Sequence, residues 1–140
     1  FRSIVFAGFA AGYLMFFLDM WFSGLFGLFG IFPGTSNAWW MLQHHIDSII
    51  FALVFAWPAV YTRLPGGGWL KGLAFGLLWA VAYFIVSTIT GQLGAELFQR
   101  MPLSFAAAIS ALLLHALWGF FLGVLYVPPQ QISAQTAEAG

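Results

Sequence analysis

Residues 39–50, W-W-M-L-Q-H-H-I-D-S-I-I, place ionisable side chains inside a long apolar run. Groups of this kind are costly in a membrane interior, where they usually mark a function or a contact between helices. Imidazole nitrogens ligate haem iron, the magnesium of a chlorin and transition metals, whereas carboxylates add oxygen ligands or relay protons. Five residues could supply this chemistry from within apolar runs: Asp19, His44, His45, Asp47 and His115.

The composition is that of a membrane protein. Of 140 residues, 62% are hydrophobic, 20% are aromatic and only 6% are charged. A soluble domain carries about 25% charged residues, so this chain could not cover a water-facing surface. Four basic residues balance four acidic ones, which leaves no basic surface for nucleic acid, and the absence of cysteine excludes disulfides and thiolate ligands. We therefore expect an integral membrane protein in contact with the lipid bilayer.

The apolar runs are long enough for four helices. A membrane-spanning helix needs about 20 predominantly apolar residues, and the chain provides such runs between turns rich in glycine and proline. Pro58 is expected to kink the second run near its end. The predicted spans are 1–31, 38–61, 69–91 and 104–127, followed by a disordered polar tail at 128–140. The expected fold class is an all-α, integral membrane four-helix bundle.

The basic residues predict how the bundle is oriented. Three of them, Arg2, Arg63 and Lys71, fall on the side of the termini, and only Arg100 falls on the other side. Because cytoplasmic loops carry the excess of lysine and arginine, both termini are expected in the cytoplasm.

A short repeat divides the chain into two halves. G-x-x-x-G occurs at Gly8–Gly12 and again at Gly72–Gly76, and the span after each motif carries a histidine, His45 or His115. This order predicts two tandem helical hairpins related by an approximate two-fold axis.

Small residues mark the faces on which the helices are expected to pack. Lipid tails are as apolar as leucine, so helices in a bilayer associate where small side chains let backbones approach. The expected helix-packing residues share their stripes with polar residues: Gly8, Gly12, Gly72, Gly76, Gly119 and Gly123. His45 should therefore point into the bundle. His44 lies about 100° round the helix, on the side of Asp47, so it would serve a neighbouring subunit or the membrane interface.

Several interpretations stay open for the polar cluster. The rise per residue gives four of the groups comparable depth in the outer half of the bundle: Asp19, His45, Asp47 and His115. His45 and His115 could clamp a b-type haem or a chlorin, with His44 as a further cofactor-binding candidate. Asp19 and Asp47 could complete a metal or proton-relay site, although no H-x-x-x-H or E-x-x-H pair is present. The simplest interpretation is a contact that fixes helix packing through hydrogen bonds of about 0.6 kcal/mol each.

Three motifs resemble those of a known group of proteins. They are G-x-x-x-G at Gly8–Gly12, K-G-x-x-x-G at Lys71–Gly76 and H-x-x-x-G-x-x-x-G-x-x-Y at His115–Tyr126. Together they resemble small, uncharacterised four-helix bacterial inner-membrane proteins of the YagU-like group, over most of the chain. The resemblance implies four helices and a bacterial inner membrane, and it implies no activity. Members of that group have a single histidine near the start of the second helix, where this chain has the pair His44 and His45.

The expected function follows from two features of the sequence: the absence of hydrolase motifs and the presence of the His/Asp cluster. No Ser-His-Asp order or paired-carboxylate arrangement supports hydrolysis, so we expect no enzyme. We expect an accessory or structural subunit of a larger bioenergetic, electron-transfer complex, docked on other membrane subunits. Its buried His/Asp cluster would fix helix packing or hold one cofactor, whose identity stays open. The alternatives are a b-type haem- or chlorin-binding electron-transfer protein, and a small transporter or a proton or ion channel.

Overall fold

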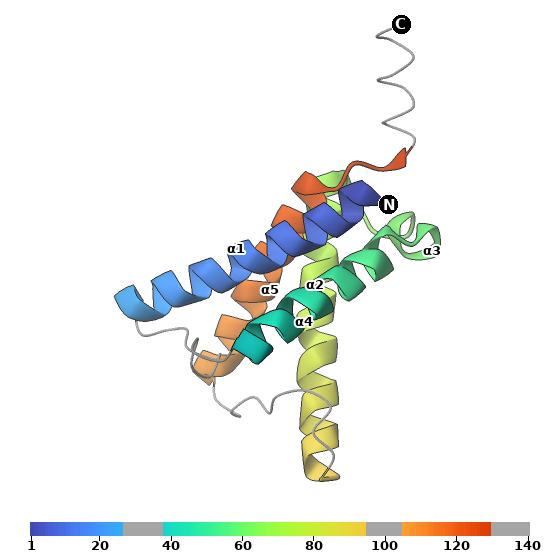
Figure 1. Ribbon diagram of the computed structural model, residues 1–140. Coiled ribbons are helices and arrows are strands. Elements are labelled where there is room, and N and C mark those ends of the chain that lie inside the picture. Colours follow the sequence, from blue (N-terminus) through green and yellow to red (C-terminus); the bar gives the residue numbers. More distant parts are fainter. Residues whose placement is uncertain (27–37, 95–104, 130–140) are drawn as a thin grey trace, which may run out of the picture.

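The computed structural model describes residues 1–26, 38–94 and 105–129, and every element in these residues is helical (Figure 1). The helices are α1 (Arg2–Phe26), α2 (Ala38–Ala56), α3 (Pro58–Tyr61), α4 (Gly68–Gln92) and α5 (Phe105–Leu125). Among the described residues, three stretches are long and apolar enough to cross a membrane: Arg2–Asp19, Gly68–Gln92 and Ala108–Leu125. The prediction of an all-α membrane protein with four main helices is therefore confirmed. The tail predicted at 128–140 lies outside the described residues beyond Pro129.

The second predicted span differs from a single continuous helix. Its apolar helical stretch, Met41–Ala56, is shorter than the other three. Trp57 adopts an extended conformation (φ −60°, ψ 126°), and Pro58 then begins the short helix α3. The proline ring disfavours helical geometry at the residue before it, which explains why the chain breaks at Trp57. The kink expected from Pro58 is thus a full interruption of the helix.

The long helices pack as two hairpins that meet along α1 and α5. α1 packs on α2, α4 packs on α5, and α1 also packs on α5. In Figure 1 the α1–α2 pair crosses the α4–α5 pair obliquely, and the C-terminal end of α4 extends beyond α2. The backbone nitrogen of Val127 donates to Ser3 Oγ at 2.9 Å, so the end of α5 lies beside the start of α1. The helix pairs are those that the repeated motif predicts.

Glycines set the spacing of α4 and α5. A Cβ on Gly72 would overlap the carbonyl oxygen of Gly119 and lie 2.6 Å from the backbone nitrogen of Gly123. A Cβ on Gly76 would likewise overlap the carbonyl oxygen of His115. Side chains are thus excluded from this contact, and the two backbones touch directly. Close backbone contact of this kind is how small residues join helices where no hydrophobic force drives them together.

An aromatic core lies at the end of the molecule that carries α3. The fully buried ring of Phe55 contacts the rings of Tyr61, Phe75 and Tyr126, at centroid distances of 5.3, 5.4 and 5.8 Å. These residues come from α2, α3, α4 and the residue that follows α5. Lys71 closes the same end, since its Nζ donates to the carbonyl oxygens of Tyr61 and Leu64. Side-chain packing holds this end of the molecule together. The polar groups of α2 lie nearer to the opposite end.

We expect Gly72→Ala to destabilise the α4–α5 contact by about 1–3 kcal/mol, because the added methyl group must displace backbone. Gly67→Ala is the matched control, since a Cβ there meets nothing within 4 Å. Reversible unfolding in detergent would measure both variants. Equal stability of Gly72→Ala and the unaltered protein would contradict the close contact.

Candidate functional site

The hydroxyl of Ser48 joins three helices. Ser48 Oγ donates to the carbonyl oxygen of Gly8 on α1 at 2.6 Å, and it accepts from Trp118 Nε1 on α5 at 2.7 Å. Ser48 and Trp118 are both buried. The first bond lies within the α1–α2 hairpin and the second reaches the α4–α5 hairpin, so one side chain connects both halves of the protein.

Glycines on α1 make room for this hydroxyl. A Cβ on Gly12 would lie 2.7 Å from Ser48 Oγ, and a Cβ on Gly8 would lie 2.7 Å from the Cβ of Ala52. α1 therefore approaches α2 closely enough for its carbonyl oxygens to accept hydrogen bonds from α2 side chains. The small-residue stripes of these two helices face each other, as do those of α4 and α5.

His45 is buried against α1 with one ring nitrogen left over. Its Nδ1 donates to the carbonyl oxygen of Met41, one turn earlier, at 2.7 Å. The carbonyl can only accept, so Nδ1 carries a hydrogen, and in the neutral imidazole Nε2 carries a lone pair. The imidazole lies 5.0 Å from the ring of Phe9 and 6.1 Å from that of Tyr13. Nε2 is buried and has no hydrogen-bond partner among the described residues.

His44 also contacts α1. Its Nε2 donates to the carbonyl oxygen of Gly12 at 3.2 Å, and its ring stands edge-on to that of His45 at 5.5 Å. His44 thus also contacts α1 of its own bundle, and its role toward a neighbouring subunit or the membrane interface stays a prediction. The side chains of His44 and His45 leave α2 in different directions. α1 packs between these two directions, so both rings contact α1.

His115 repeats the local geometry of His45 on another helix. Its Nδ1 donates to the carbonyl oxygen of Ala111, one turn earlier, at 2.8 Å, which again leaves the lone pair on Nε2. Its ring packs against Tyr83 of α4, with the centroids 5.8 Å apart. His45 thus lies against α1 and His115 against α4.

The two aspartates do not complete a metal site in the described part of the chain. Asp19 is buried on α1, whereas Asp47 on α2 is only partly buried. Across residues 1–26, 38–94 and 105–129, no three histidine, cysteine or acidic side chains come together as a group that could hold a metal ion. The expectation that Asp19 and Asp47 take part in a proton relay stays a prediction.

Some residues of this site were not singled out from the sequence. Trp118 looks like apolar bulk in a span, and Phe9 gave no sign that it would lie against a histidine, whereas Tyr83 lies on the small-residue stripe expected to face the bundle interior. The available signal was position, because Trp118 follows His115 by three residues and so lies on nearly the same face of its helix. A tryptophan on a polar face brings an indole N–H that needs an acceptor.

Comparisons with protein-family models, with curated proteins and with solved structures found no match to this chain.

Replacing Ser48 tests the link between the hairpins. We expect Ser48→Ala to lower the free energy of unfolding by about 1–2 kcal/mol, because the buried indole N–H of Trp118 loses its acceptor. Ser87→Ala is the control, since Ser87 is equally buried but donates only to Phe84 of its own helix. Unfolding in detergent would compare the two variants. A loss in Ser87→Ala as large as that in Ser48→Ala would show that the link between hairpins has no special weight.

Proposed function

We propose that this protein is a non-catalytic accessory or structural subunit of a larger electron-transfer complex in a bacterial inner membrane. The observation that carries the proposal is the division between its interior and its surface. In the described residues the interior polar side chains that join helices, those of Ser48, Trp118 and His44, find their partners within this chain. The surface meanwhile presents large apolar side chains, which suit contact with lipid or with the helices of other subunits.

α4 is the helix that we propose docks on the partner. Only 28% of its apolar span is buried, compared with 44% for the span in α1 and 39% for the span in α5. Its exposed side chains follow one another along the helix at Leu78, Val81, Ile85 and Ile89. Branched side chains with few rotamers lose little entropy on packing, so such a face suits a permanent helix–helix interface. The C-terminal end of α4 also extends beyond α2 (Figure 1).

Native purification tests this role. Extraction with a mild detergent should yield the chain within a larger assembly that contains other membrane subunits and redox cofactors. Enlarging the exposed face with Val81→Phe and Ile85→Phe should release the chain from the assembly while its helical content stays the same. Ile46→Phe with Ile50→Phe is the control, because these α2 residues are similarly exposed but lie on another helix. Migration of the unaltered protein as a free 15.4 kDa species would refute the accessory role.

A cofactor-binding role is the second candidate, and the unpartnered Nε2 of His45 favours it. Histidines that ligate a metal usually donate their other ring N–H to a backbone carbonyl or a carboxylate, which fixes the tautomer and orients the ring. His45 has this arrangement through Met41 and His115 has it through Ala111. If a b-type haem or a chlorin were bound here, His45 Nε2 would hold its metal. Phe9 and Tyr13 cover it but are each 50% exposed, so the edge of a flat macrocycle would displace two surface rings.

Reconstitution with haem b tests the cofactor candidate. The purified protein should give a Soret band typical of histidine ligation, and His45→Ala should abolish it. His44→Ala should retain the band, because the Nε2 of His44 is already bonded to Gly12. Visible spectroscopy measures both variants, and circular dichroism verifies that they fold. A flat visible spectrum after reconstitution, or equal loss in the two variants, would remove this candidate.

A further inference from the structure

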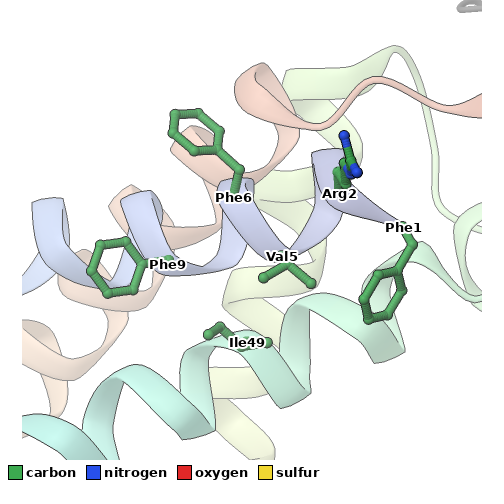
Figure 2. A pocket seen from close by; sticks show the side chains of 6 residues that line it. All are labelled: Phe1, Arg2, Val5, Phe6, Phe9 and Ile49. Carbon is green, nitrogen blue, oxygen red and sulfur yellow. The ribbon is translucent and has the colours of Figure 1, made fainter.

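His45 and His115, the two histidines that the sequence suggests as a clamp for a cofactor, pack against different helices. The ring of His45 lies against Phe9 and Tyr13 of α1, at centroid distances of 5.0 and 6.1 Å. The ring of His115 lies 5.8 Å from that of Tyr83 on α4. Phe9 and Tyr13 are half exposed, and Figure 2 shows the ring of Phe9 on the outer side of the α1–α2 pair. His45 therefore lies beneath surface side chains of this hairpin.

The hydrogen bond between Trp118 and Ser48 limits what can lie between the two histidines. Ser48 follows His45 by three residues on α2. Trp118 follows His115 by the same interval on α5. Three residues rise about 4.5 Å along a helix, and at that level the bond holds donor and acceptor 2.7 Å apart. Both side chains are buried, so α2 and α5 are in direct side-chain contact one turn from each histidine.

A cofactor ligated by both histidines would meet this contact. The macrocycle of a haem or a chlorin lies perpendicular to the line between its two axial nitrogens, and thus along α2 and α5. With its edge substituents it extends further from the metal than the rise of three helical residues. The clamp therefore requires the Ser48–Trp118 bond to break, which leaves the buried indole N–H without an acceptor.

His44 already uses its Nε2 in the contact with α1. That nitrogen donates to the carbonyl oxygen of Gly12 at 3.2 Å and so carries a hydrogen. The Nε2 of His45 is buried and has no hydrogen-bond partner among the described residues. Among the three histidines of the chain, His45 is thus the one whose Nε2 is held near α1 without a partner.

We infer that this chain supplies one histidine ligand, His45, to a tetrapyrrole cofactor and leaves the second axial position of its metal open. The inference rests on the cofactor-binding candidate proposed above, and it adds the number of ligands and the side on which they lie. In haem proteins with one proximal histidine, the polarity and access of the opposite side select the ligand that binds there. The side chains beside His45 are aromatic and half exposed, so an uncharged small molecule that enters from the membrane fits the open position.

The spin state of bound haem measures the number of ligands. The full chain is reconstituted with haem b, and the ferric protein is studied by electron paramagnetic resonance. One histidine ligand should give a high-spin signal, and added imidazole should convert it to a low-spin signal by occupying the open position. A low-spin signal before imidazole is added overturns the inference, because a second strong ligand is then already present.

His115→Ala is the matched variant, since His115 makes the same hydrogen bond to its own helix as His45. It should keep the Soret band and the high-spin signal of the unaltered protein, and circular dichroism verifies its fold. Loss of haem from folded His115→Ala would show that His115 is a ligand and would also overturn the inference. A protein that never acquires a Soret band removes the cofactor candidate together with this inference, whereas a low-spin protein with a Soret band overturns this inference alone.

Discussion

The hydrogen bonds of the Ser48 hydroxyl can form only because Gly8 and Gly12 on α1 have no side chains. Because α1 comes so close to α2, Ser48 Oγ can donate to the carbonyl oxygen of Gly8. The same oxygen then accepts a hydrogen bond from the indole N–H of Trp118. In a bilayer, apolar faces gain little from leaving lipid for each other, so directional bonds of this kind choose one packing among several of similar energy. The crossing of the two hairpins thus depends on a contact that is small in energy but specific in geometry.

The two hairpins use glycine differently, and this difference explains where chemistry can occur. Between α4 and α5, Gly72 meets the backbone of Gly119, so no side chain enters the contact. Between α1 and α2, glycines face the side chains of Ser48 and Ala52, and the wider seam admits the imidazoles of His44 and His45. The cofactor candidate therefore belongs to the α1–α2 hairpin, whereas the proposed docking face belongs to the α4–α5 hairpin.

Much of the fold could be predicted, because it follows from periodicity and from residue size. Apolar runs give the helices, and the G-x-x-x-G repeat gives the pairing of α1 with α2 and of α4 with α5. The interruption at Trp57 was only partly foreseen, because Pro58 signals a bend and its severity depends on how the chain turns toward α4. The partners of the polar groups could not be predicted. A helical wheel predicts the direction in which the His44 side chain leaves α2. It does not predict the tilt of α1, which places the carbonyl oxygen of Gly12 within reach of that side chain.

The geometry of the histidines separates structural from chemical roles within one segment. His44 donates a hydrogen bond from Nε2 to the backbone of α1 and so contributes to holding the hairpin together. His45, the next residue, donates a hydrogen bond only from Nδ1, to a carbonyl oxygen of its own helix. That bond contributes nothing to joining α1 and α2. A buried imidazole used only for packing would gain by bonding through both nitrogens, since an unsatisfied buried polar atom costs about 1–3 kcal/mol. The cost that His45 carries is therefore the feature of this bundle that packing alone does not explain.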